Sequence, residues 1–107
     1  MSLDVMLTGA VGDELYSANI THNLTGMADA AGIYMHLWRP EELGITLASE
    51  LIEPLREGLA RLEAEPEKFE AHNAPNGWGK HEHFVPFVRK YLRACENSPT
   101  ATVSVSR

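Results

Sequence analysis

The sequence predicts an α+β fold that is mostly α-helical, a compact helical domain with a small antiparallel sheet formed by the N- and C-terminal strands. Apolar and polar residues alternate at both ends, in residues 5–8 before Gly9 and in residues 102–106 after Pro99. Between the ends, apolar residues recur at the spacing of amphipathic helices. Because a lone strand leaves its backbone groups unpaired, we expect the two terminal strands to pair with each other. A purely helical bundle with frayed ends is the alternative.

The first helix is predicted from about residue 20 to residue 31, where one face carries five apolar residues: Ile20, Leu24, Met27, Ala28 and Ala31. Ser17 or Asn19 would cap its start, and Gly32 would end it. Ile33–Trp38 should form a further short helical stretch, which the following Arg-Pro pair stops. Pro40 then suits the first turn of the next helical segment.

A long amphipathic helix is predicted from Thr46 to Ala64. Its apolar stripe consists of Leu47, Leu51, Ile52, Leu55, Leu59 and Leu62. Pro54 interrupts this stripe, and a proline removes one hydrogen-bond donor and crowds the preceding turn. We therefore expect a kink or a division of the helix near Glu53.

The last third of the chain should begin with a turn of helix from Pro66 to Phe69, followed by the Asn73–Gly79 loop. A C-terminal helix comes next, with the apolar stripe Phe84, Val88, Tyr91, Leu92 and Cys95. Pro86 is tolerable if this helix starts close before it, around His83 or Phe84. Asn97 would then end the helix in a left-handed conformation.

The 107 residues, 44% of them hydrophobic, suit a single domain spanning the whole chain. Cys95 is the only cysteine, so no intramolecular disulfide can form and a reducing compartment is favoured. No apolar run approaches the roughly 20 residues of a membrane span, and the N-terminus lacks the pattern of a signal peptide. We therefore expect a soluble cytoplasmic protein with no membrane partner.

The formal net charge of -6 originates in residues 41–70, where nine acidic residues, all Glu, accompany three basic ones. An acidic chain lacks the positive surface that phosphate contacts require, so nucleic-acid binding is disfavoured. The Glu-rich stretch is either a solvated helix face or a surface that meets a basic protein partner.

Two polar segments form the candidate site, Tyr16–Asn23 and His72–Gly79. Their amide, imidazole and aromatic groups are costly to bury unless their hydrogen bonds are made. If the first segment is a helix start that packs beside the second, the two would line a pocket for an anionic or amide-bearing ligand. The predicted ligand-binding residues are Tyr16, Asn19, His22, Asn23, Asn73, Asn76 and Trp78. The structural alternative is that these side chains only brace two loops.

Trp78 lies between two glycines, which permit a sharp backbone path and offer no neighbouring side chains. The indole must either fold back as a lid on the core or stand exposed as an anchor for a ligand or partner. We expect the lid.

Several stretches together resemble a group of small proteins encoded by bacteriophages and their bacterial hosts. They are Glu14–Asn23, Met27–Tyr34, Asn76–Gly79 and Val103–Arg107. The resemblance covers nearly the whole chain. It implies a bacterial or phage cytoplasmic setting and an accessory gene product, and it carries over no catalytic residues.

No catalytic motif accompanies the candidate site. The spacing of His81 and His83 can chelate a metal from an extended segment but separates the rings around a helix, so we predict no metal and no cofactor. Cys95 lies on an apolar stripe, as a buried and inert thiol would. The sequence therefore favours a non-enzymatic interaction or regulatory module that binds a protein partner or a small polar ligand, with a homo-oligomer as an open option. The alternative is a small metal-dependent or histidine-based hydrolase that uses His22, His72 and the His81–His83 pair.

Overall fold

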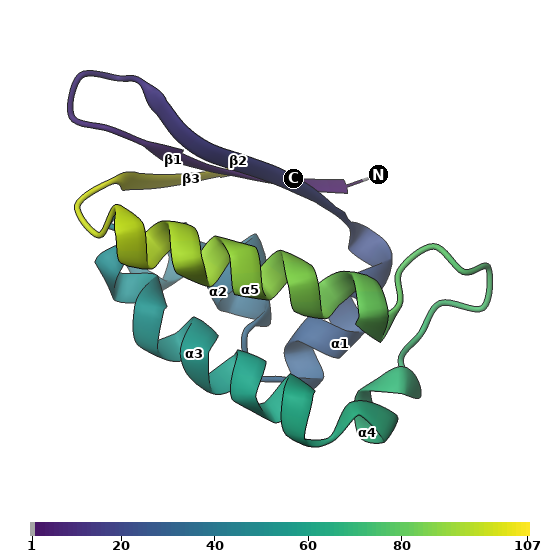
Figure 1. Cartoon of the computed structure of the whole chain (residues 1–107). Helices are drawn as coiled ribbons and strands as arrows, with labels where there is room; N and C mark the ends of the chain where they lie inside the picture. The colour runs from purple at the N-terminus through teal and green to yellow at the C-terminus, as the bar shows by residue number, and fades with distance from the viewer. Residues whose placement is uncertain (1) are drawn as a thin grey trace.

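A computed structural model describes residues 2–107, in which a three-stranded antiparallel sheet covers one side of a layer of helices (Figure 1). The strands are β1 (Ser2–Thr8), β2 (Glu14–Thr21) and β3 (Thr102–Ser106), in the order β2-β1-β3. The predicted α+β class and the predicted antiparallel pairing of the two terminal strands are confirmed. The purely helical alternative is wrong.

Strand β2 corrects the prediction that residues 16–23 begin a helix. Tyr16, Ala18 and Ile20 point toward the helices, while the residues between them are exposed or line the outer surface. Gly12, at a φ of 84°, helps to close the turn that joins β1 to β2 as a hairpin. The helical spacing of apolar residues holds only from Leu24 onward, because the preceding residues pair with the central strand instead.

The helical layer contains two long helices, α3 (Ser49–Ala64) and α5 (His81–Asn97), and several short ones. The short segments are the 3₁₀ turn His22–Leu24, α1 (Thr25–Ala30), α2 (Tyr34–Trp38), the 3₁₀ turn Pro40–Leu43 and α4 (Pro66–Glu70). The short helix before Arg39, the first-turn position of Pro40 and the helix start at Pro66 agree with the sequence predictions.

The two internal prolines correct the expected helix boundaries. Helix α3 continues across Pro54 and is not divided, and α5 begins at His81 rather than at His83 or Phe84. Each proline is the sixth residue of its helix. A proline has no backbone N–H, so the carbonyl four positions earlier, that of the second helical residue, receives no hydrogen bond from it. Only one helical residue precedes that carbonyl, so the first turn can accommodate the ring. Asn97 remains helical, and Ser98 ends α5 with a φ of -135°, so the expected left-handed closure is also wrong.

The core lies between the sheet and helices α3 and α5. The inner face of the central strand β1 contributes Leu3, Val5 and Leu7, all fully buried. Cys95 is buried as predicted, and this burial raises the pKa of its thiol to about 12. A thiol with such a pKa stays protonated at neutral pH and is a poor nucleophile.

Gly58, in the middle of α3, fits closely against Ile33. A Cβ at position 58 would lie 2.5 Å from Cγ2 of Ile33, whose side chain is itself buried. We therefore expect Gly58→Ala to lower the free energy of unfolding by about 1 kcal/mol or more, although alanine favours helices. In the control Gly26→Ala in α1, the nearest side-chain atom is 3.7 Å from the added Cβ. That change should be neutral or stabilising in urea unfolding, and equal effects of the two substitutions would contradict the close packing at Gly58.

Candidate functional site

The two polar segments predicted from the sequence meet at one end of the sheet. There the α4–α5 loop, which projects from the helical layer, approaches the end of β2 and the first residue of β1 (Figure 1). Between them lies an open pocket of about 630 Å³, called the Trp78 pocket below. Its lining residues are Ser2, Asn19, Thr21, His22, Asn23, Asn76 and Trp78.

The loop holds Trp78 outward. The backbone N–H of Ala74 donates to the carbonyl of Gly79 at 3.0 Å, and that of Gly77 donates to Ala74 at 3.1 Å, so the loop is closed on itself. Gly79 has a φ of 117° and is so close to β2 that a Cβ there would lie 3.0 Å from Thr21. The Trp78 side chain is 73% exposed, so the expected lid on the core is wrong.

One hydrogen bond joins the two segments directly. The Asn23 amide Nδ2 donates to the carbonyl of Trp78 at 2.7 Å, and the Trp78 N–H donates to Oδ1 of Asn76 at 3.0 Å. Asn23 is held in turn by its own N–H, which donates to Oγ1 of Thr21 at 3.2 Å. Each of these amides uses one end to fix the loop and keeps the other end available to the pocket.

His22 connects the pocket to the core. The buried Trp38 donates its indole N–H to Nδ1 of His22 at 2.8 Å. An acceptor Nδ1 requires the neutral ring to carry its proton on Nε2. His22 therefore satisfies a buried donor with one nitrogen and supplies a hydrogen-bond donor with the other.

Asn19 stands on the outer face of β2. Its Nδ2 donates both to Oγ of Ser2, at 2.8 Å, and to Oδ1 of Asp4, at 2.7 Å. Its Oδ1 has no hydrogen-bond partner within residues 2–107 and remains an acceptor.

Two predicted ligand-binding residues lie outside the pocket. Tyr16 is half-buried and stacks on Tyr91 with ring centroids 6.0 Å apart, and burial raises the pKa of its hydroxyl. Asn73 accepts the backbone N–H of His81 at 2.8 Å and so caps the start of α5. Conversely, Ser2 and Thr21 line the pocket although neither was among the predicted ligand-binding residues. They face each other across β1 and β2, a register that only the strand assignment of residues 14–21 could have revealed.

Both histidines of the His81-Glu82-His83 segment form hydrogen bonds that stabilise the start of α5. Nε2 of His81 lies 2.8 Å from the carbonyl of Leu62, and its ring stacks on Phe69. Nδ1 of His83 accepts the N–H of Lys80 at 3.3 Å. In the part of the chain that the structure describes, no three His, Cys, Asp or Glu side chains converge as metal ligands would.

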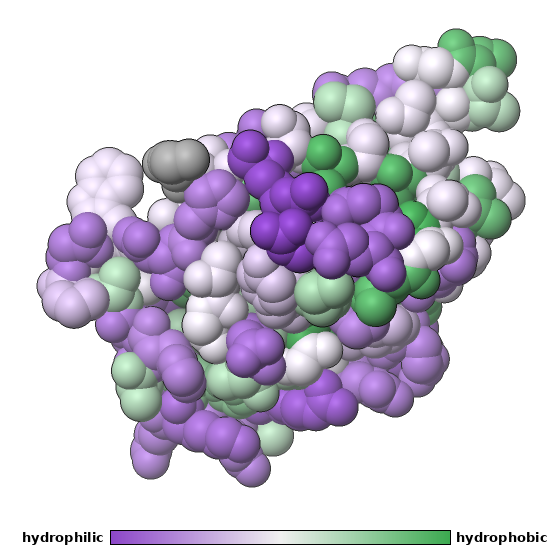
Figure 2. Space-filling view, turned by 180° about the vertical axis from the view of Figure 1, so that it is seen from behind, coloured by the Kyte–Doolittle hydropathy of each residue, from purple (hydrophilic) through white to green (hydrophobic). Residues whose placement is uncertain are grey.

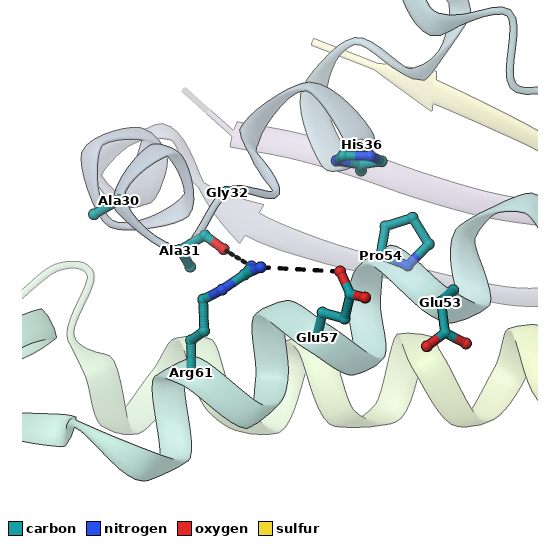
Figure 3. A pocket seen from close by; sticks show the side chains of 8 residues that line it. All are labelled: Ala30, Ala31, Gly32, His36, Glu53, Pro54, Glu57 and Arg61. Carbon is teal, nitrogen blue, oxygen red and sulfur yellow. Dashed lines mark hydrogen bonds and ion pairs between the residues drawn. The ribbon is translucent and has the colours of Figure 1, made fainter.

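A second hollow, of about 360 Å³, lies between the α1–α2 turn and α3 (Figure 3). Arg61 crosses it, donating to the carbonyl of Ala31 at 2.8 Å and approaching the Glu57 carboxylate at 3.9 Å. Nδ1 of His36 is buried here and has no hydrogen-bond partner among residues 2–107. Burial accordingly lowers the pKa of His36 below its usual 6.5.

This shift predicts a pH dependence of folding. Because its pKa is lower in the folded chain, His36 binds a proton more readily in the unfolded chain. The free energy of unfolding is therefore highest well above pH 6.5 and decreases as the pH drops toward the lower pKa of the folded chain. We expect His36→Gln to reduce the loss of stability between about pH 7.5 and about pH 5.5, a range above the titration of most carboxylates. Urea unfolding at both pH values measures the difference, and parallel losses in both proteins would contradict it. Glu53, Glu57 and Arg61 are the charged residues that line the same hollow.

No protein-family model, no curated protein and no solved structure matches the chain. Among the helices of residues 2–107, none combines the length and the apolar character needed to cross a membrane. The function of the Trp78 pocket is therefore inferred from its own chemistry.

Proposed function

We propose that this protein is a non-enzymatic binding module whose Trp78 pocket takes an uncharged ligand rich in hydroxyl or amide groups. The observation that carries the proposal is an indole that is 73% exposed beside a hollow with no charged lining residue. Two hydrogen bonds fix the backbone of Trp78, and its indole is exposed. The indole therefore offers an apolar face to a ligand, and little backbone freedom is lost when the ligand binds.

The hydrogen-bonding groups of the pocket are mixed. Oδ1 of Asn19 and Oδ1 of Asn23 are acceptors, whereas Nδ2 of Asn76 and Nε2 of His22 are donors. A ligand that both donates and accepts through neighbouring groups can satisfy all of them, as the hydroxyls of a sugar or a carboxamide do. The anionic ligand considered from the sequence is less well supported, because the first segment is a strand and not the start of a long helix.

The proposal is tested by titrating the protein with N-acetylglucosamine while following tryptophan fluorescence. This sugar carries hydroxyls, a neutral amide and an apolar ring face. We expect a saturable shift to shorter wavelength with a Kd of about 1 mM, as for a small polar ligand on an open site. Glucose and N-methylacetamide then separate the contributions of the hydroxyls and the amide, and sodium acetate is the charged control.

Two neighbouring asparagines provide matched variants. Asn76→Ala removes a donor from the pocket, whereas Asn73→Ala removes the cap of α5 and leaves the lining unchanged. We expect Asn76→Ala and Trp78→Ala to weaken binding at least about fivefold with little loss of stability, and Asn73→Ala to do the reverse. Absence of saturable binding by all three neutral probes, or equal binding by wild type and Trp78→Ala in a calorimetric titration, which does not depend on the indole, would contradict the proposal.

The competing class is a small metal-dependent or histidine-based hydrolase. Against it, His22, His81 and His83 each use a ring nitrogen in a hydrogen bond that holds the fold. Metal analysis of the purified protein separates the two classes, because stoichiometric zinc would favour the hydrolase. The setting that we propose is the cytoplasm of a bacterium, on the basis of the resemblance described under the sequence analysis and of the single, buried cysteine.

A further inference from the structure

The two edge strands of the sheet, β2 and β3, differ in how far other segments of the chain cover them. The outer edge of β3 is partly covered, because Thr46 accepts the N–H of Val103 at 2.9 Å and Leu47 forms a β-bridge with Thr102. Arg107 closes the same side by donating to the carbonyl of Trp38 at 2.6 Å and by pairing with Glu41. Strand β2, in contrast, pairs only with β1, and its outward backbone groups form no hydrogen bond with another backbone group within residues 2–107.

Apart from a register irregularity that leaves Leu15 unpaired in the β1–β2 ladder, strand β2 also lacks the usual protection of a free edge. Exposed edge strands are normally shortened or carry lysine or proline, which prevents pairing with another chain. This strand is eight residues long, has no lysine, arginine or proline, and carries its single charge at Glu14, its first residue. Two copies of it can therefore pair antiparallel without placing like charges opposite each other.

Met6, which is 38% exposed, lies opposite the middle of β2, and further exposed large hydrophobic residues lie near the two ends of the strand. Val11 in the hairpin turn is 90% exposed and Leu15 is 47% exposed, and hydrophobic residues gather at this projecting end (Figure 2). At the opposite end, Trp78 stands beside a hollow of about 280 Å³ that Ile20 and Thr21 also line. Antiparallel pairing of β2 with a second β2 brings the hairpin end of each copy to the Trp78 end of the other.

We propose that the chain forms a two-fold dimer through β2, in which the two sheets join into one antiparallel sheet of six strands. The axis passes near Ser17 and Ala18, so the Leu15 of each copy lies opposite the partner's Asn19–Thr21 end. The interface is isologous, because the same strand, hairpin and loop serve both sides. The dimer covers the face of Trp78 that adjoins Ile20, and it does not depend on a ligand in the pocket described above.

Two serines allow a matched test. Ser17 on β2 and Ser104 on β3 are both exposed, and both lie directly opposite Met6 on the outer face of the sheet. Ser17→Lys places a charge at the proposed interface, whereas Ser104→Lys places the same charge on the other edge. Val11→Asp is a second variant in a turn that is almost fully exposed, so it should not disturb folding. Circular dichroism confirms that each variant is folded.

Sedimentation velocity measures the mass against 11.8 kDa for one chain. We expect the wild type to form the dimer at micromolar concentration, with a Kd that rises at least about tenfold in Ser17→Lys, several-fold in Val11→Asp and less than about twofold in Ser104→Lys. Hydrogen exchange of β2 amides should slow as the wild-type protein is concentrated. A wild-type monomer at about 100 μM, equal effects of Ser17→Lys and Ser104→Lys, or association without protection of β2 would each overturn the proposal.

Discussion

Deleting Ala101–Arg107 is expected to unfold the domain or to lower its free energy of unfolding by at least about 3 kcal/mol, a large share of the stability of a small domain. The deletion removes all of β3, whose residues pair with residues 4–8 of the central strand. Val103 and Val105 also pack against the core, and Ala101 is buried. The truncated chain would expose the edge of β1 and leave a two-stranded hairpin, which is marginal without further support.

Thermal and urea unfolding followed by circular dichroism measure this loss. The control is a chain shortened only by Arg107, which loses the contacts with Trp38 and Glu41 but keeps the β1–β3 ladder. We expect the control to lose much less stability than the truncated chain, because the Arg107–Glu41 pair is partly exposed and screened by solvent. A truncated chain that melts cooperatively at nearly the temperature of the full-length protein would show that terminal pairing does not stabilise the fold.

Replacing His22 with alanine is expected to cost about 1–3 kcal/mol of stability, because it leaves the buried indole N–H of Trp38 without an acceptor. The same substitution removes the Nε2 donor from the pocket. Binding of N-acetylglucosamine should therefore weaken by more than the fall in the folded fraction accounts for. Both stability and binding decrease because Nδ1 of His22 accepts the hydrogen bond from Trp38, whereas Nε2 serves as a donor in the pocket.

A double-mutant cycle isolates the structural role. Trp38→Phe removes the donor, so in that background His22→Ala should cost less than in the wild type, with a coupling free energy of at least about 0.5 kcal/mol. Urea unfolding of the four proteins gives the four free energies. Additive effects of the two substitutions would mean that the hydrogen bond between Trp38 and His22 contributes nothing to stability.

The sequence predicts the terminal strands well because both alternate over several residues and neither competes with a helical pattern. Strand β2 was missed for a physical reason. Ile20 and Leu24 are four positions apart and mimic one helix face, although Ile20 belongs to a strand and Leu24 to the following turn. Long-range pairing with β1 outweighs that local pattern, and it is set by the hairpin turn around Gly12.

The candidate site was predicted in part. The sequence located the two polar segments, and the structure brings Asn19, His22, Asn23, Asn76 and Trp78 together around one pocket. It could not distinguish Asn73, which caps a helix, from Asn76, because both are loop amides of the same kind. The sequence could not predict the orientation of Trp78 either. The flanking glycines permit the indole to face the core or the solvent, and the close contact of Gly79 with β2, which the sequence does not reveal, selects the solvent.

The most direct test of the binding site is a titration of ¹⁵N-labelled protein with N-acetylglucosamine, followed by amide chemical shifts. We predict saturable shifts confined to Ser2, to residues 19–23 and 76–79, which are far apart in sequence, and to the indole N–H of Trp78. The cap residue Asn73 and the His36 hollow should remain unchanged. Shifts in only one of the two segments, or shifts centred on the hollow around Arg61, would contradict a shared pocket at Trp78.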